Sequence, residues 1–462
     1  MIFRQQIGFL VLLFLSGCMV GPKYEKPSVK LPDKYAEQHQ AGSQGDLARW
    51  WAAFEDPCLS ILIEKAIKNN FDLRIATEKI EEARAFYRIQ DAKLYPDIDA
   101  IGKITRNGIS KNLTQSASLK ESTLNYFQAG FDTLWEIDFW GKLRRSKQAA
   151  YNELQAQVEA MRDVYIILLG DIAKAYIDSR TLQKKIDLLN QKIALSTKLI
   201  SLTDDRFYAG VDNQRADLEQ QEELCELRNQ LLILQTTFRQ TVNKLALLLG
   251  EYPERFELAP GDHVVPQYKK NLGIGLPSEL LRRRPDIRRA EKLLAAATER
   301  VGQAIADWFP SFSLLGLVDF EANKGSKWFS SNSFSWSIGP SVRWPIITFG
   351  RIQFNIDEKK SIQKQAFLAY GQAVVKALGD VENSLVAYFN GQKEVAVLCE
   401  KLLVATRKSD LAYEVFCSGL VNEIDFLLAE KNRLTIEAEL TSAEQAASVA
   451  LVSMYKALGG EW

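Results

Sequence analysis

The chain contains one sequence pattern twice, and this internal repeat restricts the possible folds more than any other feature. The stretch 62–96 aligns without a gap with 276–310, and the later stretch "WEIDFWGKL" (135–143) aligns with "WPIITFGRI" (344–352). The matches continue in the same order towards the C-terminus. Self-similarity of this kind indicates two copies of one supersecondary unit.

Each copy predicts the same order of elements. A helical stretch ends at an aromatic-proline pair, and two strand-like segments separated by a polar loop follow. A glycine-basic pair, Gly141-Lys142 or Gly350-Arg351, then precedes a long helix, and a second long helix returns after a short break. We therefore predict a first repeat at 58–261 and a second at 262–462.

The long helices have the spacing of coiled coils. Apolar residues recur at alternating steps of three and four, which is a heptad seam. Proline is absent from Gly141 to about Asp204, so at 1.5 Å per residue this run reaches about 90 Å. We expect an elongated bundle packed against copies of itself. The seam residues are Leu168, Ile172, Ala175, Leu182, Ile186, Leu189, Ile193 and Ile200, and on the return Leu224, Leu227, Leu231, Leu234, Phe238, Thr241, Leu245 and Leu248.

Four segments alternate with period two, at 97–105, 124–135, 310–321 and 333–344. In the last, "SFSWSIGPSVRW", one face is large and apolar and the other is rich in serine. Aromatic residues end the apolar face, as in the interfacial girdles of membrane strands. The polar stretches 106–123 and 321–333 are predicted outer loops. The residues expected to face lipid are Phe312, Leu314, Val318, Phe334, Trp336, Ile338, Val342 and Trp344.

This alternation is typical of a transmembrane β-barrel, in which strands of about 9–11 residues have one apolar and one polar face. The alternative is a soluble antiparallel sheet with one wet face. Four strands cannot close a barrel, and an open edge in lipid leaves backbone groups unpaired. Copies must therefore associate, and three copies give twelve strands, enough to leave a lumen. The small polar residues between Ser333 and Ser341 favour a water-filled interior.

The N-terminus has the features of a bacterial lipoprotein. Residues 1–17 have an early arginine, a short apolar run and small residues, as in a signal peptide. "LSGC" resembles a lipobox in which Cys18 receives the lipid; the alternative is an ordinary secretory signal. Met19 is not the aspartate associated with inner-membrane retention, so we expect the outer membrane. Residues 18–57 are predicted to be an extended tether.

The composition excludes several classes of protein. Lys+Arg and Asp+Glu are 58 each, and the five arginines of "RRRPDIRR" (282–289) suit a helix start, so no nucleic-acid partner is expected. Cysteines 58, 225, 399 and 417 lack metal-ligand spacing, so we expect no metal or cofactor beyond the lipid on Cys18. No hydrolase, zinc-protease or P-loop motif occurs, which argues against an enzyme.

With these features in hand, the chain resembles the TolC-type outer-membrane factors, in the NodT/OprM-like lipoprotein branch. The matching tracts are "GCMVGPKYEKP", "WWAAFEDPCLSILIEKAIKNNFDLRIA", "LLRRRPDIRRAEKLLAAATERVGQAIADWFPSFSLLG", "WPIITFGRI" and "ALGGEW". The resemblance implies an α+β membrane protein with four transmembrane strands and long coiled-coil helices per chain. Three copies would form a 12-stranded barrel and a periplasmic α-helical barrel. The implied partners are outer-membrane lipid, a periplasmic adaptor and an inner-membrane pump.

The resemblance also implies sites at the helix turns. Gly210 and Gly419 would lie in the turns at the periplasmic tip, where a left-handed residue ends each helix. Just beyond the second turn, Asp425 and Leu428 would constrict the pore, although the usual acidic position holds Leu428. The expected function is a passive export duct for small molecules. The alternatives are a duct for type I protein secretion and a periplasmic helical adaptor or scaffold.

Overall fold

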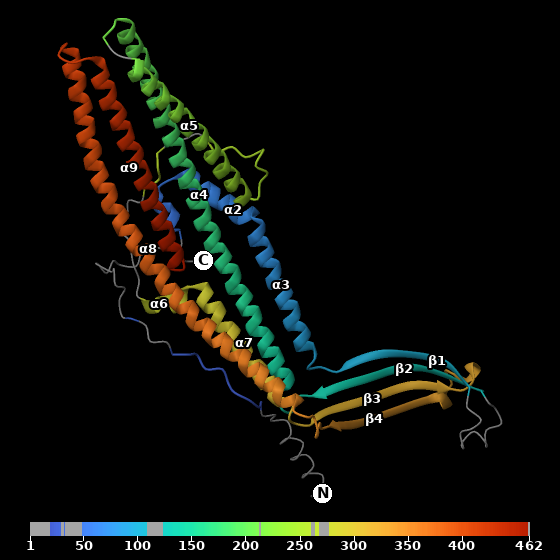
Figure 1. Cartoon of the computed structure of the whole chain (residues 1–462). Helices are drawn as coiled ribbons and strands as arrows, with labels where there is room; N and C mark the ends of the chain where they lie inside the picture. Colours follow the sequence, from blue (N-terminus) through green and yellow to red (C-terminus); the bar gives the residue numbers. More distant parts are fainter. Residues whose placement is uncertain are drawn as a thin grey trace. The chain divides into compact units, whose positions relative to one another are not determined.

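The computed structural model describes residues 19–28, 32, 49–108, 123–211, 214–259, 264–267 and 277–460. Figure 1 shows long helices and one sheet. The strands are β1 (Asp97–Gly108), β2 (Thr123–Ile137), β3 (Ser311–Ala322) and β4 (Phe334–Arg343). The helices are α2 (Pro57–Asn69), α3 (Phe71–Ala92), α4 (Lys142–Tyr208), α5 (Gln214–Leu248), α6 (Pro277–Arg283), α7 (Pro285–Ala306), α8 (Arg351–Cys417) and α9 (Glu423–Ala457). Short 3-10 turns are η1 (Trp50–Phe54), η3 (Gly325–Lys327) and η4 (Ser331–Ser333).

The two repeats agree in the lengths of their long helices. Helices α4 and α8 each have 67 residues, and helices α5 and α9 each have 35. The expected order of strand, strand, long helix and returning helix is present in both copies. The predicted seam residues of α4 and α5 are all buried or half-buried, as the heptad spacing requires. Within the described residues, no helix combines the length and the apolar composition needed to cross a bilayer.

Two compact units make up the chain, and each takes segments from both repeats. The first unit comprises Met1–Ser28, Lys79–Val158 and Arg289–Gly371. The second comprises Val29–Glu78, Glu159–Arg288 and Gln372–Trp462. The sequence repeats and the compact units are therefore different divisions of the chain.

The first unit holds the sheet. The four described strands form one antiparallel sheet in the order β1-β2-β3-β4 (Figure 1). The strands run further than the alternation predicted, because Arg106–Gly108 continue β1 and Thr123 begins β2. The predicted loop 106–123 was therefore too long at both ends, while residues 109–122 lie outside the described residues. Likewise, Glu321 and Ala322 belong to β3, and η3 and η4 follow.

A small apolar cluster and a buried ion pair support the helices of the first unit. Ala304 of α7 packs with Ile352 and Ile356 of α8, and all three are at most 3% exposed. Between α4 and α7, Arg145 Nη1 donates to Glu299 Oε2 at 2.6 Å. An unpaired buried charge is strongly unfavourable. Helices α4 and α7 therefore cannot move apart without a large loss of stability.

The second unit buries apolar residues of its helices and contains a stacked aromatic pair. Leu59 and Ile63 of α2 and Ile172 of α4 are fully buried. The ring of Trp50 in η1 stacks on that of Tyr455 in α9, with the ring centroids 5.2 Å apart. The Trp50-Trp51 pair, which the sequence placed in a tether, is thus buried in this unit.

Candidate functional site

The apolar face of the sheet is continuous across all four strands. The β3–β4 register places Val318 opposite Trp336 and Gly316 opposite Ile338, and the β2–β3 register places Phe131 opposite Val318. Trp336 is 67% exposed and Ile338 is 66% exposed. Of the residues expected to face lipid, Val318, Phe334, Trp336, Ile338, Val342 and Trp344 are exposed, whereas Phe312 and Leu314 are half-buried. An apolar surface of this extent marks an interaction with lipid or another protein.

The opposite face is mainly polar, although Ile101, Leu134, Leu315 and Leu317 also lie on it, and it has its own hydrogen bonds. Asp319 is only 1% exposed, and its carboxylate accepts hydrogen bonds from Gln128 Nε2 at 2.6 Å and Ser335 Oγ at 2.8 Å. Gly130 lies opposite Asp319 and leaves space for it. The three strands β2, β3 and β4 are therefore joined by side chains as well as by the backbone.

Acidic side chains predominate on this polar face. Asp99 of β1 lies directly opposite Asp132 of β2, a cross-strand pair of like charges that costs stability. Such a cost suggests a role other than holding the sheet together. The acidic residues of this face are Asp97, Asp99, Asp132, Glu136, Asp319 and Glu321, and the basic ones are Lys103 and Arg343.

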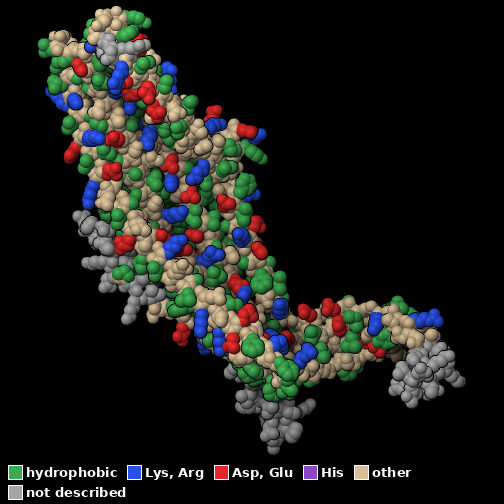
Figure 2. All heavy atoms as spheres, viewed as in Figure 1, with side chains coloured by type: hydrophobic (Ala, Val, Ile, Leu, Met, Phe, Trp, Pro, Cys, Tyr) green, Lys and Arg blue, Asp and Glu red, His purple; other side chains and the backbone are tan. Residues whose placement is uncertain are grey.

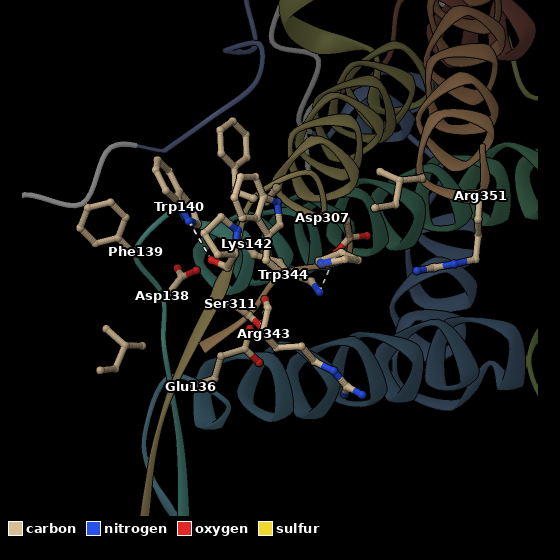
Figure 3. A pocket seen from close by; sticks show the side chains of 16 residues that line it. Glu136, Asp138, Phe139, Trp140, Lys142, Asp307, Ser311, Arg343, Trp344 and Arg351 are labelled. Carbon is tan, nitrogen blue, oxygen red and sulfur yellow. Dashed lines mark hydrogen bonds and ion pairs between the residues drawn. The ribbon is translucent and has the colours of Figure 1, made fainter. Parts of the chain in front are cut away.

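A cavity of about 470 Å³ lies where the strands meet the helices of the first unit, and Figure 3 shows the side chains that line it. Two tryptophans are held in it, because Trp140 Nε1 donates to the carbonyl oxygen of Pro310 at 2.9 Å and Trp344 Nε1 donates to that of Trp308 at 3.1 Å. Lys142 Nζ pairs with Asp307 Oδ1 at 2.7 Å. The matched tracts "WEIDFWGKL" and "WPIITFGRI" both reach this cavity, a role that the sequence alignment did not reveal.

The turn from β2 into α4 depends on one carboxylate. Asp138 accepts hydrogen bonds from the backbone N–H groups of Leu143 and Arg144 at 3.0 and 2.9 Å. The Arg144 side chain pairs with the same carboxylate at 3.0 Å. A carboxylate at a helix N-terminus satisfies free N–H donors and interacts favourably with the helix dipole. Asp138 therefore fixes the direction in which α4 leaves the sheet.

In the second unit, both helix turns end at a left-handed glycine. Gly210 has φ +71° and Gly419 has φ +73°, the backbone conformation expected from the sequence. The N–H of Val211 donates to the carbonyl oxygen of Arg206, and that of Leu420 donates to the carbonyl oxygen of Val415. These bonds satisfy carbonyl groups at the helix ends. The two turns are thus equivalent in backbone geometry.

The predicted constriction residues lie in the first turns of α9. Asn422 caps this helix by accepting a hydrogen bond from the N–H of Asp425 at 3.0 Å. Asp425 is exposed and Leu428 is 46% exposed, whereas the neighbouring Leu427 is 1% exposed. Leu427 is therefore a core residue, and Asp425 and Leu428 have side chains free to meet solvent or another molecule.

A charged network joins α9 to α4 and α8. Arg433 pairs with Glu430 at 2.6 Å and with Glu437 at 2.8 Å. Lys184 pairs with Glu437 at 2.7 Å, and Ser409 donates to Glu430 at 2.7 Å. The hydrogen bond from Arg433 lowers the pKa of Glu430. Burial raises the pKa of Glu437, but its ion pairs outweigh burial and leave that pKa below its ordinary value.

The predicted acylation site, Cys18, lies outside the described residues. The described cysteines Cys58, Cys225, Cys399 and Cys417 are free, and Cys58 is half-buried while the other three are exposed. In the described part of the chain, no three histidine, cysteine or acidic side chains gather as metal ligands would.

The arginine tract has an internal role. Arg284 is 8% exposed; its side chain pairs with Asp286 at 2.6 Å and Asp380 at 3.1 Å, and donates to the carbonyl oxygen of Ala457 at 3.0 Å. This arginine joins the start of α7 to α8 and to the end of α9.

Comparison with known proteins identifies the family. The model of the outer membrane efflux protein family matches residues 62–251 and 276–460, one segment in each predicted repeat. The chain belongs to the outer membrane efflux protein family. The family expected from the sequence is thereby confirmed, and with it an outer-membrane efflux channel.

Relatives agree over nearly the whole chain. Nodulation protein T of Rhizobium leguminosarum bv. trifolii is 30% identical over 443 residues, covering 94% of this chain and 92% of the relative. Cation efflux system protein CusC of Escherichia coli K12 is 29% identical, covering 98% of each chain. The probable outer membrane lipoprotein SilC of Salmonella typhimurium is 27% identical, covering 99% of this chain and 98% of that one.

Solved structures agree in fold. The outer-membrane channel OprN is 28% identical and superimposes with a TM-score of 0.86, covering 96% of this chain and all of that chain. The predicted fold class and the outer-membrane location are confirmed by these neighbours and relatives.

Proposed function

We propose that this outer-membrane efflux family member is a homotrimeric duct that carries small molecules out of the cell with the help of partner proteins. The observation that supports association of copies is the sheet itself, and three copies give twelve strands, enough to leave a lumen. Within the described strands, β1 and β4 each pair on one side only, and their apolar face is exposed. Free strand edges cannot remain unpaired in lipid, so β4 of one copy pairs with β1 of the next.

Exposed apolar side chains on the long helices support the same assembly. On the face shown in Figure 2, hydrophobic side chains reach the surface of the helices between charged ones. Leu232 of α5 is 64% exposed, and Leu403 of α8 is 73% exposed. In a trimer such residues pack against neighbouring copies and form the proposed helical barrel.

The test of the assembly is the mass of the purified mature protein in detergent, measured by native mass spectrometry. A trimer is expected. A molecule that stays monomeric in detergent and in bilayers would refute the proposal, because its sheet edges would have no partner.

The partners proposed are a periplasmic adaptor and an inner-membrane pump. The family membership and the relatives named as efflux-system proteins support them. The alternative cargo is secreted protein. Deleting the gene and restoring it on a plasmid would distinguish the two, since small-molecule export predicts greater drug susceptibility with unchanged levels of secreted protein.

The acidic polar face favours cationic or neutral cargo. In the proposed barrel this face lines the lumen, where an excess of one charge sign concentrates opposite ions. Reversal potentials of purified channels in a salt gradient should show cation preference. The variants Asp99→Asn and Asp132→Asn should reduce that preference, and an unchanged reversal potential would refute the assignment.

Two further sites belong to the proposal. Cys18 carries the lipid, which the lipobox and the relative named as a probable lipoprotein support. Asp425 and Leu428 constrict the trimer axis near the helix turns, which their exposure beside the buried Leu427 supports.

A further inference from the structure

The segment "MVGPKYEK" (19–26) directly follows the predicted acylation site and makes specific contacts within the first unit. The N–H of Val20 donates to the carbonyl oxygen of Trp140 at 3.1 Å, just beyond the end of β2. Arg145 Nη2 donates to the carbonyl oxygens of Val20 and Gly21 at 3.0 and 3.2 Å. These hydrogen bonds hold the segment against the first unit.

The residue that contacts this segment is itself buried. Arg145 is 1% exposed, and its other amino group pairs with Glu299, which is 7% exposed. A buried guanidinium is tolerated only when its donors find acceptors. The carbonyl groups of residues 20 and 21 supply those acceptors, so the segment completes the surroundings of a buried ion pair.

Two glycines lie where the segment approaches the rest of the unit closely. Gly21 has φ +88°, and a Cβ there would lie 2.6 Å from the Cα of Gly302. Gly141 has φ +78°, and a Cβ there would lie 2.5 Å from Cγ of Met19. Left-handed backbone of this kind suits glycine alone at low cost. The equivalent Gly350 has φ +84° without such a contact to the segment, so the backbone of Gly141 belongs to the repeated turn, whereas the contact with Gly302 requires glycine at position 21.

A second contact holds the far end of the segment. Glu291 of α7 accepts a hydrogen bond from Tyr24 Oη at 3.3 Å and pairs with Lys26 Nζ at 2.9 Å. The Glu291 side chain is only 16% exposed. The segment is thus held at both ends, by Arg145 near Val20 and by Glu291 near Lys26.

We propose that residues 19–26 are a docking motif and that Arg145, Glu299, Gly302 and Glu291 form its receptor. This proposal rests on the proposed acylation of Cys18. The receptor holds Val20, two residues after the proposed acylation site, next to the end of β2, so that the lipid and the sheet enter the bilayer together. A single lipid binds membranes only weakly. A lipid held beside the strands raises the effective concentration of those strands at the bilayer.

The docking is tested on the mature full-length protein in detergent with endoproteinase Lys-C. Mass spectrometry follows release of the peptide 18–23 by cleavage after Lys23. Release from the wild type is expected to be slow. Gly21→Ala should accelerate it at least about tenfold, because the left-handed conformation and the contact with Gly302 are lost. The control Gly102→Ala should behave as wild type, since a Cβ there meets nothing within 4 Å.

A second variant covers the case in which Gly21→Ala disturbs folding. Tyr24→Phe combined with Lys26→Met removes both contacts to Glu291, and should accelerate release by roughly threefold. Wild-type rates for both variants would overturn the docking. These rates do not depend on whether the protein conducts cargo.

The placement of the lipid has its own readouts. The mass of the released peptide shows whether Cys18 carries acyl chains, and an unmodified cysteine would overturn the placement. With acylation shown, Gly21→Ala protein added to liposomes should form heat-modifiable oligomers several-fold more slowly than wild type, because proximity of lipid and strands is lost. Equal rates would overturn the placement while leaving the docking intact.

Discussion

Gly130 of β2 lies directly opposite Asp319 of β3, and a Cβ on Gly130 would lie 2.4 Å from the Cα of Asp319. Asp319 is buried beneath Gln128 and Ser335, so it cannot move away. A side chain at position 130 must therefore displace the strand pair.

Gly130→Ala is accordingly expected to destabilise the sheet by about 1–3 kcal/mol, as overpacking does. The yield of heat-modifiable oligomers in outer-membrane fractions is the measurement. Gly339→Ala is the matched control, because it changes a glycine of the same sheet whose Cβ would meet nothing within 4 Å. Equal yields for the two variants would contradict the prediction.

Ile338→Arg should prevent stable insertion of the sheet. Ile338 is 66% exposed on the apolar face, and a charge at that depth costs about 2–4 kcal/mol per chain in a membrane barrel. The neighbouring Ser337→Arg places the same charge on the polar face and should insert. Membrane fractions washed with urea and probed for oligomers distinguish the two, and equal insertion would argue against a lipid-facing surface.

Arg284→Ala should lower the free energy of unfolding by roughly 3–5 kcal/mol, because two acidic partners and a helix-end carbonyl lose a buried donor. Thermal unfolding followed by circular dichroism is the measurement. Arg283→Ala serves as the control. Arg283 is less buried and pairs with Glu279 at 3.3 Å, so its loss should cost at most about 1 kcal/mol.

An acidic pair near the first helix turn makes stability depend on pH. Partial burial and the neighbouring Asp217 raise the pKa of Asp204 above its ordinary value of 3.8. The folded state therefore holds this proton more tightly than the unfolded state does. Ionised Asp204 therefore destabilises the folded state. This effect is complete above the raised pKa, diminishes as the pH falls through that pKa, and is absent below pH 3.8.

Asp217→Asn should consequently raise the Tm at pH 7.5, and its advantage over wild type should shrink as the pH is lowered towards 4. Gln221 Nε2 donates to Asp217 Oδ2 at 2.7 Å, a hydrogen bond that the amide oxygen of asparagine can still accept, while Asp217 Oδ1 is buried without a donor. Glu222→Gln, which alters an exposed carboxylate on the same helix, should leave the pH dependence unchanged. A constant difference across this pH range would contradict the assignment.

Asp425→Ala and Leu428→Ala should each raise the single-channel conductance of the purified protein, because each removes an exposed group from the proposed constriction. Leu427→Ala should leave the open conductance unchanged but destabilise the fold by about 2–5 kcal/mol, since Leu427 is buried. Unchanged conductance in both of the first two variants would remove the constriction from these residues.

The periodic spacing of apolar residues predicted the helices and strands, because buried positions recur at regular intervals along each of them. The alternation of "SFSWSIGPSVRW" predicted β4 to within one residue at each end, and the heptad seam predicted the buried positions of α4 and α5. The strand ends beyond Thr105 were missed because Arg106, Asn107 and Gly108 have loop-like composition. Backbone pairing, and not residue type, extends β1 there.

Single contacts between distant segments had no such periodic signal. Nothing in the spacing linked Arg145 to Glu299, or either of them to Val20, since these residues come from three separate parts of the chain. The burial of Asp319 was equally hidden, because it depends on which residue of β2 lies opposite. Register and close packing were therefore the information missing from the sequence.

The equal lengths of the paired helices, 67 and 35 residues in both repeats, have a further consequence. Leu218 and Leu427 are equivalent positions just beyond the two turns, yet Leu218 is 55% exposed and Leu427 is 1% exposed. The two repeats thus share the lengths of their helical hairpins, but equivalent side chains differ in burial. The surface of one hairpin can therefore change while the packing of the other is kept. A single chain in this way presents two different surfaces on hairpins of equal length.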